Sequence, residues 1–548
     1  MSSFRKYLTT SSIALSLAFT VLAASTCGAS NKEPSASSTD DTKSAPAQTL
    51  SPEQKYQDFL TRYKDLPLQG ADYEAVLKSD KFKTVLEYLL ENSVRNDLTA
   101  ANLKAAAKAA LNAYDEKLKS GEVKEAKTEQ TILTVALNGM MSYASPHDDY
   151  FPPREAAEFQ QNMSGQFGGL GFQFAPTESA DGNIIVEETV EDGPAQRAGV
   201  RKGDIITGVN GTSFLGKKQN EVIELLRGEP GSNAVLDIKR DGQNMKISVT
   251  REIIKAKQVA YKMLEGGVAH ITLARFDTNA SMEIKHAIAK AKADALINPQ
   301  TRGNGGLRGV ILDLRFNPGG LLEEARRIVD DFIDKEGLVA STVGRKPEFG
   351  DRETSVKGDI LGGLPLAVLV NEASASASEV VAGALQDHQR ATIIGSDTFG
   401  KGTVQTTNPA VLKDGSIVKA TIAIYRRPAG TSPQFVGVHP DVKVISKDTE
   451  YNEYINNLVR EKDRPRAIPN PKGVAAEQFR TKSVCTPTDQ AASLTPANST
   501  DKNVFTRAGK VDPFVACARD HLLQQQNASF RSALTITSTV QHSPAPTQ

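Results

Sequence analysis

The residues best suited to chemistry lie in the stretch Asn371–Gln405. Three serines, Ser374, Ser376 and Ser378, alternate with alanines there, and Glu379 and a run of apolar residues at helical spacing follow them. A hydroxyl at the start of a helix has unpaired backbone N–H groups and the positive end of the helix dipole beside it. These surroundings stabilise a developing oxyanion, so the pattern predicts a nucleophilic serine. The spacing does not separate the three serines, and helix capping would need only one of them.

A lysine and a glutamine that follow this helix supply a candidate base. A short strand is expected at Ala391–Ile394, and then come the glycine-flanked Lys401 and, four residues later, Gln405. If the chain is extended after Lys401, the side chains of Lys401, Thr403 and Gln405 point the same way, because side chains alternate in a strand. A buried, neutral lysine amine can activate a serine without a histidine. The stretch therefore predicts a Ser–Lys serine peptidase.

The elements that must position these side chains alternate between strands and helices. Apolar strands are expected at Val268–Leu273, Val310–Arg315, Leu366–Val370 and Ser416–Tyr425. Ser281–Ile297 has an apolar face of helical period between the first two. Continuous apolar strands that alternate with helices are typical of a sheet covered on both faces. The sequence therefore predicts a layered α/β core over residues 256–447.

Length and charge limit the class of protein. With 548 residues the chain is long enough for several domains. It has 65 lysines and arginines against 65 aspartates and glutamates, so its formal net charge is zero. This balance gives no electrostatic steering toward nucleic acid or an acidic membrane surface, and no nucleic-acid partner is expected.

Residues 1–27 have the character of an export signal. Two basic residues precede the apolar run Ile13–Ala24, and small residues follow it. The run is shorter than the about 20 apolar residues that cross a bilayer. Its end resembles a bacterial lipoprotein signal with Cys27 as the lipidated residue, although cleavage after Ser25 or Ala29 stays open. We expect a protein of the periplasm or cell envelope, in contact with the membrane only through a lipid at Cys27, with a flexible linker over residues 28–51.

Residues 52–160 have mostly helical apolar patterns. They end in a polar break in which His147 precedes Asp148 and Asp149. A histidine beside two carboxylates could bind a metal or belong to a catalytic triad. A polar cluster in a turn more often caps local backbone groups, and we expect local capping here. No metal site and no cofactor are predicted.

Residues 161–255 change to a glycine-rich, strand-forming pattern. Strands are expected at Ile184–Glu187, Val235–Lys239 and Lys246–Thr250, and a short helix is expected at Asn220–Leu226. Over its whole length this unit resembles a PDZ domain. The resemblance implies that backbone N–H groups of Leu170, Gly171 and Phe172 bind the terminal carboxylate of a peptide that adds to the sheet as a strand. Without the resemblance, this glycine-rich turn would indicate only a bulge or a hairpin.

The C-terminal part, residues 448–548, predicts a helical extension that loses its pattern in a flexible tail past about Gln525. Besides Cys27 the chain has two cysteines, Cys485 and Cys517. In an exported protein two cysteines favour one disulfide, and two buried free thiols are the alternative.

Several spaced motifs resemble those of the C-terminal processing, or tail-specific, peptidases, which are bacterial and chloroplast serine endopeptidases with an inserted PDZ domain. Between residues 142 and 442 the motifs are SPHDDYF, GGLGF, LRGEPGS, DLRFNPGG, NEASASASE, ALQD, FGKGTVQ and VGVHPDV. The resemblance implies that Ser376 is the nucleophile, Lys401 the general base and Gln405 the residue that orients the lysine. It implies a multidomain chain with a helical N-terminal region, a PDZ domain, a layered α/β peptidase core and a helical C-terminal extension.

The same resemblance implies an oxyanion hole made by the N–H of Ala377 and that of Gly319 or Gly320. Asp387 would be a supporting polar residue. It lies 11 positions past Ser376, about 16 Å along a straight helix, so it cannot bond the nucleophile directly. The implied substrates are exported proteins with accessible apolar C-terminal tails, and an adaptor protein and a homo-oligomer stay open.

Three alternatives compete with a Ser–Lys peptidase. Gly395–Lys401 nearly completes a phosphate-binding loop, but Gly402 stands where the Mg²⁺-binding hydroxyl is needed. A non-catalytic peptide-binding protein would leave Lys401 without a purpose. A Ser-His-Asp triad would use His388 or His439 as its base.

The inserted PDZ unit could gate the active site or only tether substrate. Because it is an insertion, we expect its two ends to enter and leave at the same place, with hinges at Gly165–Gly169 and around Lys255. Under gating, a bound tail favours the position that aligns Lys401 with Ser376. Under tethering, it only raises the local concentration of substrate.

Overall fold

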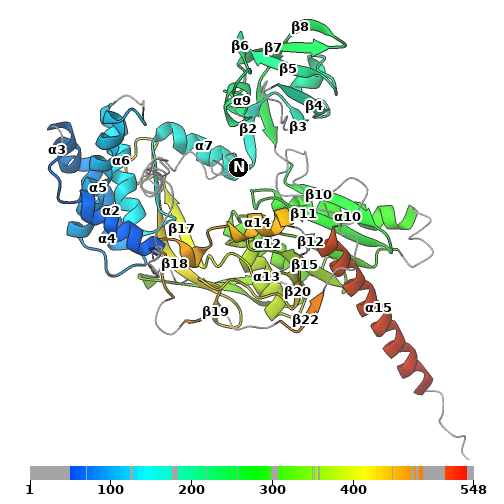
Figure 1. Cartoon of the computed structure of the whole chain (residues 1–548). Coiled ribbons are helices and arrows are strands. Elements are labelled where there is room, and N and C mark those ends of the chain that lie inside the picture. The colour runs from blue at the N-terminus through cyan, green and yellow to red at the C-terminus, as the bar shows by residue number, and fades with distance from the viewer. Residues whose placement is uncertain are drawn as a thin grey trace, which may run out of the picture.

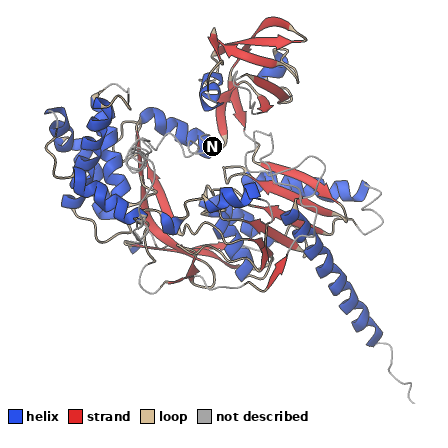
Figure 2. Cartoon of the chain, in the orientation of Figure 1, coloured by secondary structure: helices blue, strands red, loops and turns tan. Residues whose placement is uncertain are grey.

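A computed structural model of the chain describes residues 50–68, 71–123, 127–175, 183–217, 219–255, 257–297, 306–347, 350, 352–355, 358–446, 449–470, 474–476, 481–485 and 512–539. The expected export signal and Cys27 lie outside these residues. Figure 1 shows N-terminal helices, a β unit set apart from the rest, and an α/β core, and Figure 2 shows how helices and strands divide among them. The predicted multidomain fold class is confirmed. Across the described residues, no helix combines the length and the hydrophobicity that a bilayer span requires.

The N-terminal part is helical, as its apolar patterns predict. Its helices are α2 (Pro52–Tyr63), α3 (Ala71–Lys78), α4 (Asp80–Asn92), α5 (Ala100–Lys119), α6 (Glu129–Ala144) and α7 (Pro153–Ser164). Ser51, Ser79, Thr99 and Thr128 each cap a helix start by accepting a backbone N–H. After α6 the chain turns into the short strand β1 (Asp149–Phe151), which pairs with β18 (Ile417–Arg426) of the core. The polar break at residues 145–149 is thereby held inside the protein.

The inserted unit is an antiparallel sheet with strand order β3-β4-β5-β7-β8 and β6 paired to β5. Its elements are β3 (Phe172–Ala175), β4 (Ile184–Thr189), α8 (Pro194–Arg197), β5 (Ile205–Val209), β6 (Thr212–Ser213), α9 (Gln219–Leu226), β7 (Asn233–Arg240) and β8 (Gln243–Thr250). The flanking strands β2 (Gln166–Gly169) and β9 (Glu252–Lys255) pair with each other. The unit therefore enters and leaves through one two-stranded stalk, as expected for an insertion.

The core contains a seven-stranded sheet with the order β10-β11-β12-β15-β16-β20-β22. Its strands are β10 (Val259–Leu264), β11 (Val268–Leu273), β12 (Gly309–Asp313), β15 (Leu366–Val370), β16 (Thr392–Gly395), β20 (Val442–Val444) and β22 (Ser483–Cys485). β10 and β11 pair antiparallel, and every later pair is parallel. Parallel neighbours place the ends of β12, β15 and β16 at one edge, where the loops that carry the candidate residues begin.

Helices cover both faces of this sheet. Val310 and Leu312 of β12 pack with α10 (Ala280–Ile297), α12 (Leu322–Phe332) and α13 (Ala377–Asp387) on one face. Ile311, between them, packs with α15 (Pro513–Thr539) on the other. This alternation explains why the strand is apolar throughout. Instead of burying one side, α13 is enclosed on all sides, because it contacts β16, α12 and β13 (Gly337–Gly344).

A second sheet joins the core to the N-terminal helices. Its order is β1-β18-β13-β14, and β17 (Thr403–Asn408) pairs with β18. The remaining elements are β14 (Arg352–Ser355), β19 (Thr431–Ser432), α14 (Thr449–Asn456), η4 (Glu461–Asp463) and β21 (Ala475–Ala476). Because β17 begins two residues after Lys401, this sheet places the lysine segment beside the start of α13.

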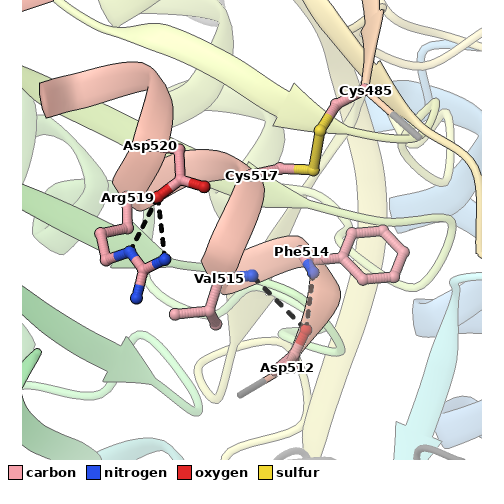
Figure 3. The surroundings of a disulfide bond; sticks show 7 residues. All are labelled: Cys485, Asp512, Phe514, Val515, Cys517, Arg519 and Asp520. Carbon is pink, nitrogen blue, oxygen red and sulfur yellow. Dashed lines mark hydrogen bonds and ion pairs between the residues drawn. A yellow bond between two sulfur atoms is a disulfide. The ribbon is translucent and has the colours of Figure 1, made fainter. Parts of the chain in front are cut away.

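A disulfide attaches the C-terminal extension to the core. Cys485 of β22 is bonded to Cys517 of α15, with their Cα atoms 6.4 Å apart (Figure 3). The predicted pairing is confirmed. Asp512 accepts the N–H of Phe514 at the start of α15 and forms an ion pair with Arg315 of the core. The helix continues past Gln525 to Thr539, so the expected loss of pattern there does not mark the end of the helix.

Removing this disulfide should destabilise the folded protein. We expect replacement of Cys485 and Cys517 by serine to lower the free energy of unfolding by about 2–4 kcal/mol, because the unfolded chain loses a cross-link. Denaturant unfolding of both proteins measures the difference. Peptide mapping without reductant should recover the two cysteines in one linked pair, whereas two free thiols would contradict the structure.

Candidate active site

Ser376 lies where the chain turns from β15 into α13. It immediately precedes the helix and has φ 57° and ψ −113°. For a residue other than glycine this conformation costs about 1–3 kcal/mol, and such strain is common where function fixes the backbone. The turn leaves the Ser376 side chain partly exposed at the positive end of α13.

The other two serines of the motif are buried, and their hydroxyls are hydrogen-bonded. Ser374 Oγ donates to Leu314 O at 2.8 Å and accepts the N–H of Asn371 at 2.9 Å. Ser378 Oγ donates to Asn317 O at 3.0 Å and so ties α13 to the loop after β12. Both side chains are fully buried. The Ser376 side chain is instead partly exposed and shares a capping box with Glu379 at the start of α13, so the structure separates the three hydroxyls where their spacing could not.

The loop after β12 packs against Ser376. A Cβ added to Gly319 would lie 2.7 Å from Ala375 O and 2.9 Å from the Cβ of Ser376, so a side chain has no room there. The N–H of Gly319 donates to Asn317 Oδ1 at 2.8 Å. Within the described chain, neither the N–H of Gly320 nor that of Ala377 has an acceptor. Gly320 and Ala377 are therefore the backbone donors available to a ligand.

Lys401 is held by Gln405. Its Nζ donates to Gln405 Oε1 at 2.6 Å and to Thr403 O at 3.2 Å. Gln405 Nε2 donates to Thr403 Oγ1 and Thr421 Oγ1, both at 3.1 Å, and this fixes the amide with its oxygen toward the lysine. A bulge between Val404 and Gln405 interrupts the expected alternation, yet the side chains meet. No hydrogen bond joins Lys401 to Ser376 in the part of the chain described, and such contacts often tighten only when substrate binds.

The surroundings of Lys401 favour its neutral form. Withdrawal of the amine from water lowers the pKa of Lys401 to about 8. The carboxylates of Glu461 and Glu379 oppose this shift, and the positive charges of Lys419 and Arg464 add to it. A lysine with this pKa is substantially deprotonated at slightly alkaline pH and can accept a proton.

The carboxylate of Glu379 fixes Ser376 and Lys401 relative to each other. Its Oε2 accepts the backbone N–H of Ser376 at 2.8 Å and that of Lys401 at 2.9 Å. Its Oε1 accepts the Gly400 N–H and the Thr398 hydroxyl. Burial raises the pKa of Glu379, and these four donors oppose the rise. The sequence indicated only an acidic residue at a helix start, whereas the structure shows a buried clamp between two loops.

The polar break at residues 145–149 adjoins the Lys401 site, which the expectation of purely local capping missed. Ser145 and Asp148 are buried and bond to the Thr421 hydroxyl, which also receives the Gln405 amide. His147 Nε2 lies 2.7 Å from Glu461 Oε2. The His147 N–H does cap the local turn through Ser145, but the imidazole faces the C-terminal extension. The only sequence signal was the SPHDDYF motif itself.

Comparisons with known proteins identify the family. Residues 267–444 match the model of peptidase family S41, and residues 185–240 match that of a PDZ domain. A carboxy-terminal-processing protease of Bartonella bacilliformis is 39% identical over 319 residues, which cover 58% of this chain and 70% of that protein. The chain belongs to peptidase family S41. The prediction of a serine peptidase with a PDZ domain is confirmed.

A second relative agrees with this S41 assignment. A probable CtpA-like serine protease of Staphylococcus haemolyticus is 37% identical over 341 residues, which cover 61% of this chain and 62% of that protein. Among solved structures, a photosystem II D1 C-terminal processing protease has 24% sequence identity and a TM-score of 0.37 over 73% of this chain and 100% of that one.

Asp387 and the two candidate histidines contact other parts of the core. Asp387, at the far end of α13, pairs with the buried Arg427 at 2.8 Å and anchors the helix to the end of β18. His388 Nε2 bonds Leu338 O, and His439 Nδ1 bonds Asp397. His388 is thus engaged with the backbone of β13, and the Lys401 variants decide between the lysine and a histidine as base.

The fold also bears on the nucleotide-binding hypothesis and on a metal site. A strand, β17, follows Lys401, whereas a phosphate-binding loop needs a helix there, so the nucleotide-binding hypothesis is wrong. Among the described residues, no group of three or more His, Cys, Asp or Glu side chains is placed to hold a metal ion. In the PDZ unit, Leu170 is buried, Gly171 has φ 75°, and Phe172 begins β3.

Proposed function

We propose that this S41 peptidase is an exported endopeptidase that binds the C-terminal tails of proteins through its PDZ unit and cleaves them with Ser376 and Lys401. The observation that carries the proposal is that the Glu379 carboxylate holds Ser376, at the start of α13, together with Lys401, whose amine Gln405 orients. The PDZ match supports tail binding at Leu170–Phe172. Export rests on the pattern of residues 1–27.

The proposed reaction is acyl transfer. Neutral Lys401 takes the Ser376 proton as the hydroxyl oxygen forms a bond to the peptide carbonyl carbon. The N–H groups of Ala377 and Gly320 stabilise the oxyanion. Lys401 then gives the proton to the leaving amine as the C–N bond breaks. Water attacks the acyl-enzyme by the same route and frees Ser376.

Mass spectrometry of protein C-termini tests this function. Envelope proteins from cells with the active chain should show shortened C-termini that are absent from cells carrying Ser376→Ala. The uncleaved forms of these proteins should have apolar C-terminal residues, since a PDZ unit binds a terminal carboxylate beside an apolar side chain. Identical C-termini in the two samples would contradict the proposal, provided that the chain is present in the envelope fraction.

Tail binding should also gate the site, because the stalk is connected to the oxyanion loop. A Cβ on Gly165, just before β2, would lie 1.9 Å from Asp277 Oδ2, so the stalk fits tightly on the core. Next to Asp277, the backbone C=O of Phe276 accepts the Leu321 N–H, and its N–H donates to Gly319 O. These two bonds hold the residues on either side of Gly320. Movement of the stalk can therefore reach Gly320 through a single residue step.

A short substrate without a PDZ-binding tail separates gating from tethering. We expect a separate tail peptide, added in trans, to raise kcat for this substrate severalfold, because binding shifts the population toward the aligned state. Deletion of residues 165–250 should remove the response and change kcat. If the tail peptide has no effect or only competes, and the deletion leaves kcat unchanged, the PDZ unit is a tether.

A further inference from the structure

A segment of the C-terminal extension, Arg460–Ile468, runs between the core and the N-terminal helices, and we name it the strap. It follows α14, contains η4, and lies outside the residues matched by the family model. On the core side Arg460 donates to Thr398 O and to Val436 O. On the other side Arg466 Nε donates to Tyr143 O at 2.9 Å. Both sides of the strap are therefore held by the protein.

The strap places a fully buried carboxylate, that of Glu461, beside the Lys401 loop. Glu461 Oε1 accepts Gln434 Nε2 at 3.0 Å, and Gln434 Oε1 accepts the N–H of Gly402 at 2.6 Å. Gly402 directly follows Lys401, so one amide side chain connects Glu461 to the lysine backbone. The second oxygen of Glu461 faces His147 Nε2 at 2.7 Å. The Gln434 contact thus links this carboxylate to the Lys401 loop.

The charges around Lys401 come from several elements. Glu461 and Arg464 belong to the strap, Glu379 belongs to α13, and Lys419 belongs to β18. The Arg464 guanidinium lies over the ring of Phe399, 5.4 Å from its centre, within the loop that leads to Lys401. The strap therefore brings one negative and one positive group to the lysine.

The groups next to the Glu461 carboxylate leave it charged. Burial lowers the pKa of His147, and the charge and hydrogen bond of Glu461 oppose this shift. Burial pushes the pKa of Glu461 up, but the charge and hydrogen bond of His147, the hydrogen bond from Gln434 and the positive charge of Lys401 hold the pKa below its ordinary value. Asp148 contacts Thr421 and not the lysine.

We propose that Glu461 is a positioning residue of the peptidase, which fixes the Lys401 loop through Gln434 and balances the Lys401 charge together with Arg464. The proposal rests on the proposed Ser376–Lys401 reaction. A segment about 60 residues later in the chain thus controls the position and the pKa of the general base, Lys401. The charges of Glu461 and Arg464 shift that pKa in opposite directions. A carboxylate favours the protonated lysine, and a guanidinium favours the neutral one.

The test compares pH–rate profiles of the full-length chain on a short substrate without a PDZ-binding tail. For Glu461→Gln we expect the alkaline-rising limb of kcat/KM to move to lower pH by roughly one unit, since the lysine loses a favourable charge. For Arg464→Gln we expect the limb to move to higher pH. The plateau kcat of Glu461→Gln should fall about tenfold with KM unchanged, because the lysine is less well positioned.

Two matched variants complete the experiment. Glu461→Asp keeps the charge and should return the limb to within about 0.3 units of the wild-type position. Asp115→Asn removes a buried carboxylate of the N-terminal helices, away from Lys401, and should leave the limb unchanged. Circular dichroism checks that each variant is folded. If Glu461→Gln fails to fold, the alkaline shift of Arg464→Gln still decides whether strap charges act on the lysine.

Three results would overturn the inference. The first is a limb that stays in place in both Glu461→Gln and Arg464→Gln. The second is a shift of both variants in the same direction, because that would mean general loosening of the site. The third is a His147→Gln variant that is as inactive as Lys401→Ala, because the imidazole would then be the base. An active Lys401→Arg variant, by contrast, would refute the underlying function and not the strap alone.

Discussion

Ser376→Ala should lower kcat/KM by roughly 10⁴-fold or more while the protein stays folded, because no other hydroxyl can form the acyl-enzyme. Because the serine side chain takes part in the capping box of α13, its loss should lower the free energy of unfolding by no more than about 0.5–2 kcal/mol. Ser374→Ala and Ser378→Ala serve as matched controls. Each removes a buried hydrogen bond and should cost about 1–3 kcal/mol of unfolding free energy, yet the folded variants should keep turnover.

Assays on a fluorogenic peptide, together with denaturant unfolding, separate these effects. A fluorophosphonate probe, which labels activated serines, should modify the wild type and both control variants. It should not modify Ser376→Ala. Labelling of Ser376→Ala, or its turnover within tenfold of the wild type, would move the nucleophile elsewhere.

Lys401→Arg should be as inactive as Lys401→Ala, since a guanidinium keeps its proton at any working pH and cannot act as a base. In the wild type the base works in its deprotonated form. The pKa of Lys401 is lowered to about 8, so kcat/KM should rise with pH and level off above this value. An unshifted lysine would place the limb near 10.4 instead.

The position of the limb is measured with the same fluorogenic peptide between pH 5 and 10. Lys401→Met, of similar length and without charge, controls for packing and should be inactive yet stable. A limb near the ordinary histidine value of about 6.5, or measurable activity of Lys401→Arg, would speak for a histidine base.

Local patterns predicted the core well, because its strands are buried on both faces and are therefore continuously apolar. β15 has the predicted bounds Leu366–Val370, and α10 begins one residue before the predicted Ser281. β12 ends at Asp313, earlier than the predicted Arg315, and there the backbone N–H and the guanidinium of Arg315 both bond the Asp313 carboxylate. Periodicity describes such elements because each residue's environment follows from its place in the strand or helix.

The second sheet and the surroundings of Lys401 could not be predicted in this way. β13 contains glycines and half-buried polar residues, so it has no clear period. The contacts of Glu379 depend on where the loop at Thr398–Lys401 returns, which is set by tertiary packing. The motif around His147 marked a place in the sequence, but it carried no information about the distant residue that faces it.

The contact between His147 and Glu461 has a consequence for when the enzyme becomes active. Its partners are 314 positions apart, and closing a loop of that length costs entropy that only a nearly complete native core can offset. The nucleophile helix and the lysine strand are closer in sequence and can form earlier. A nascent or half-folded chain therefore contains Ser376 and Lys401 but lacks a finished base pocket. Proteolytic activity would then begin only at a late stage of folding, so the order of assembly would itself protect the unfinished chain.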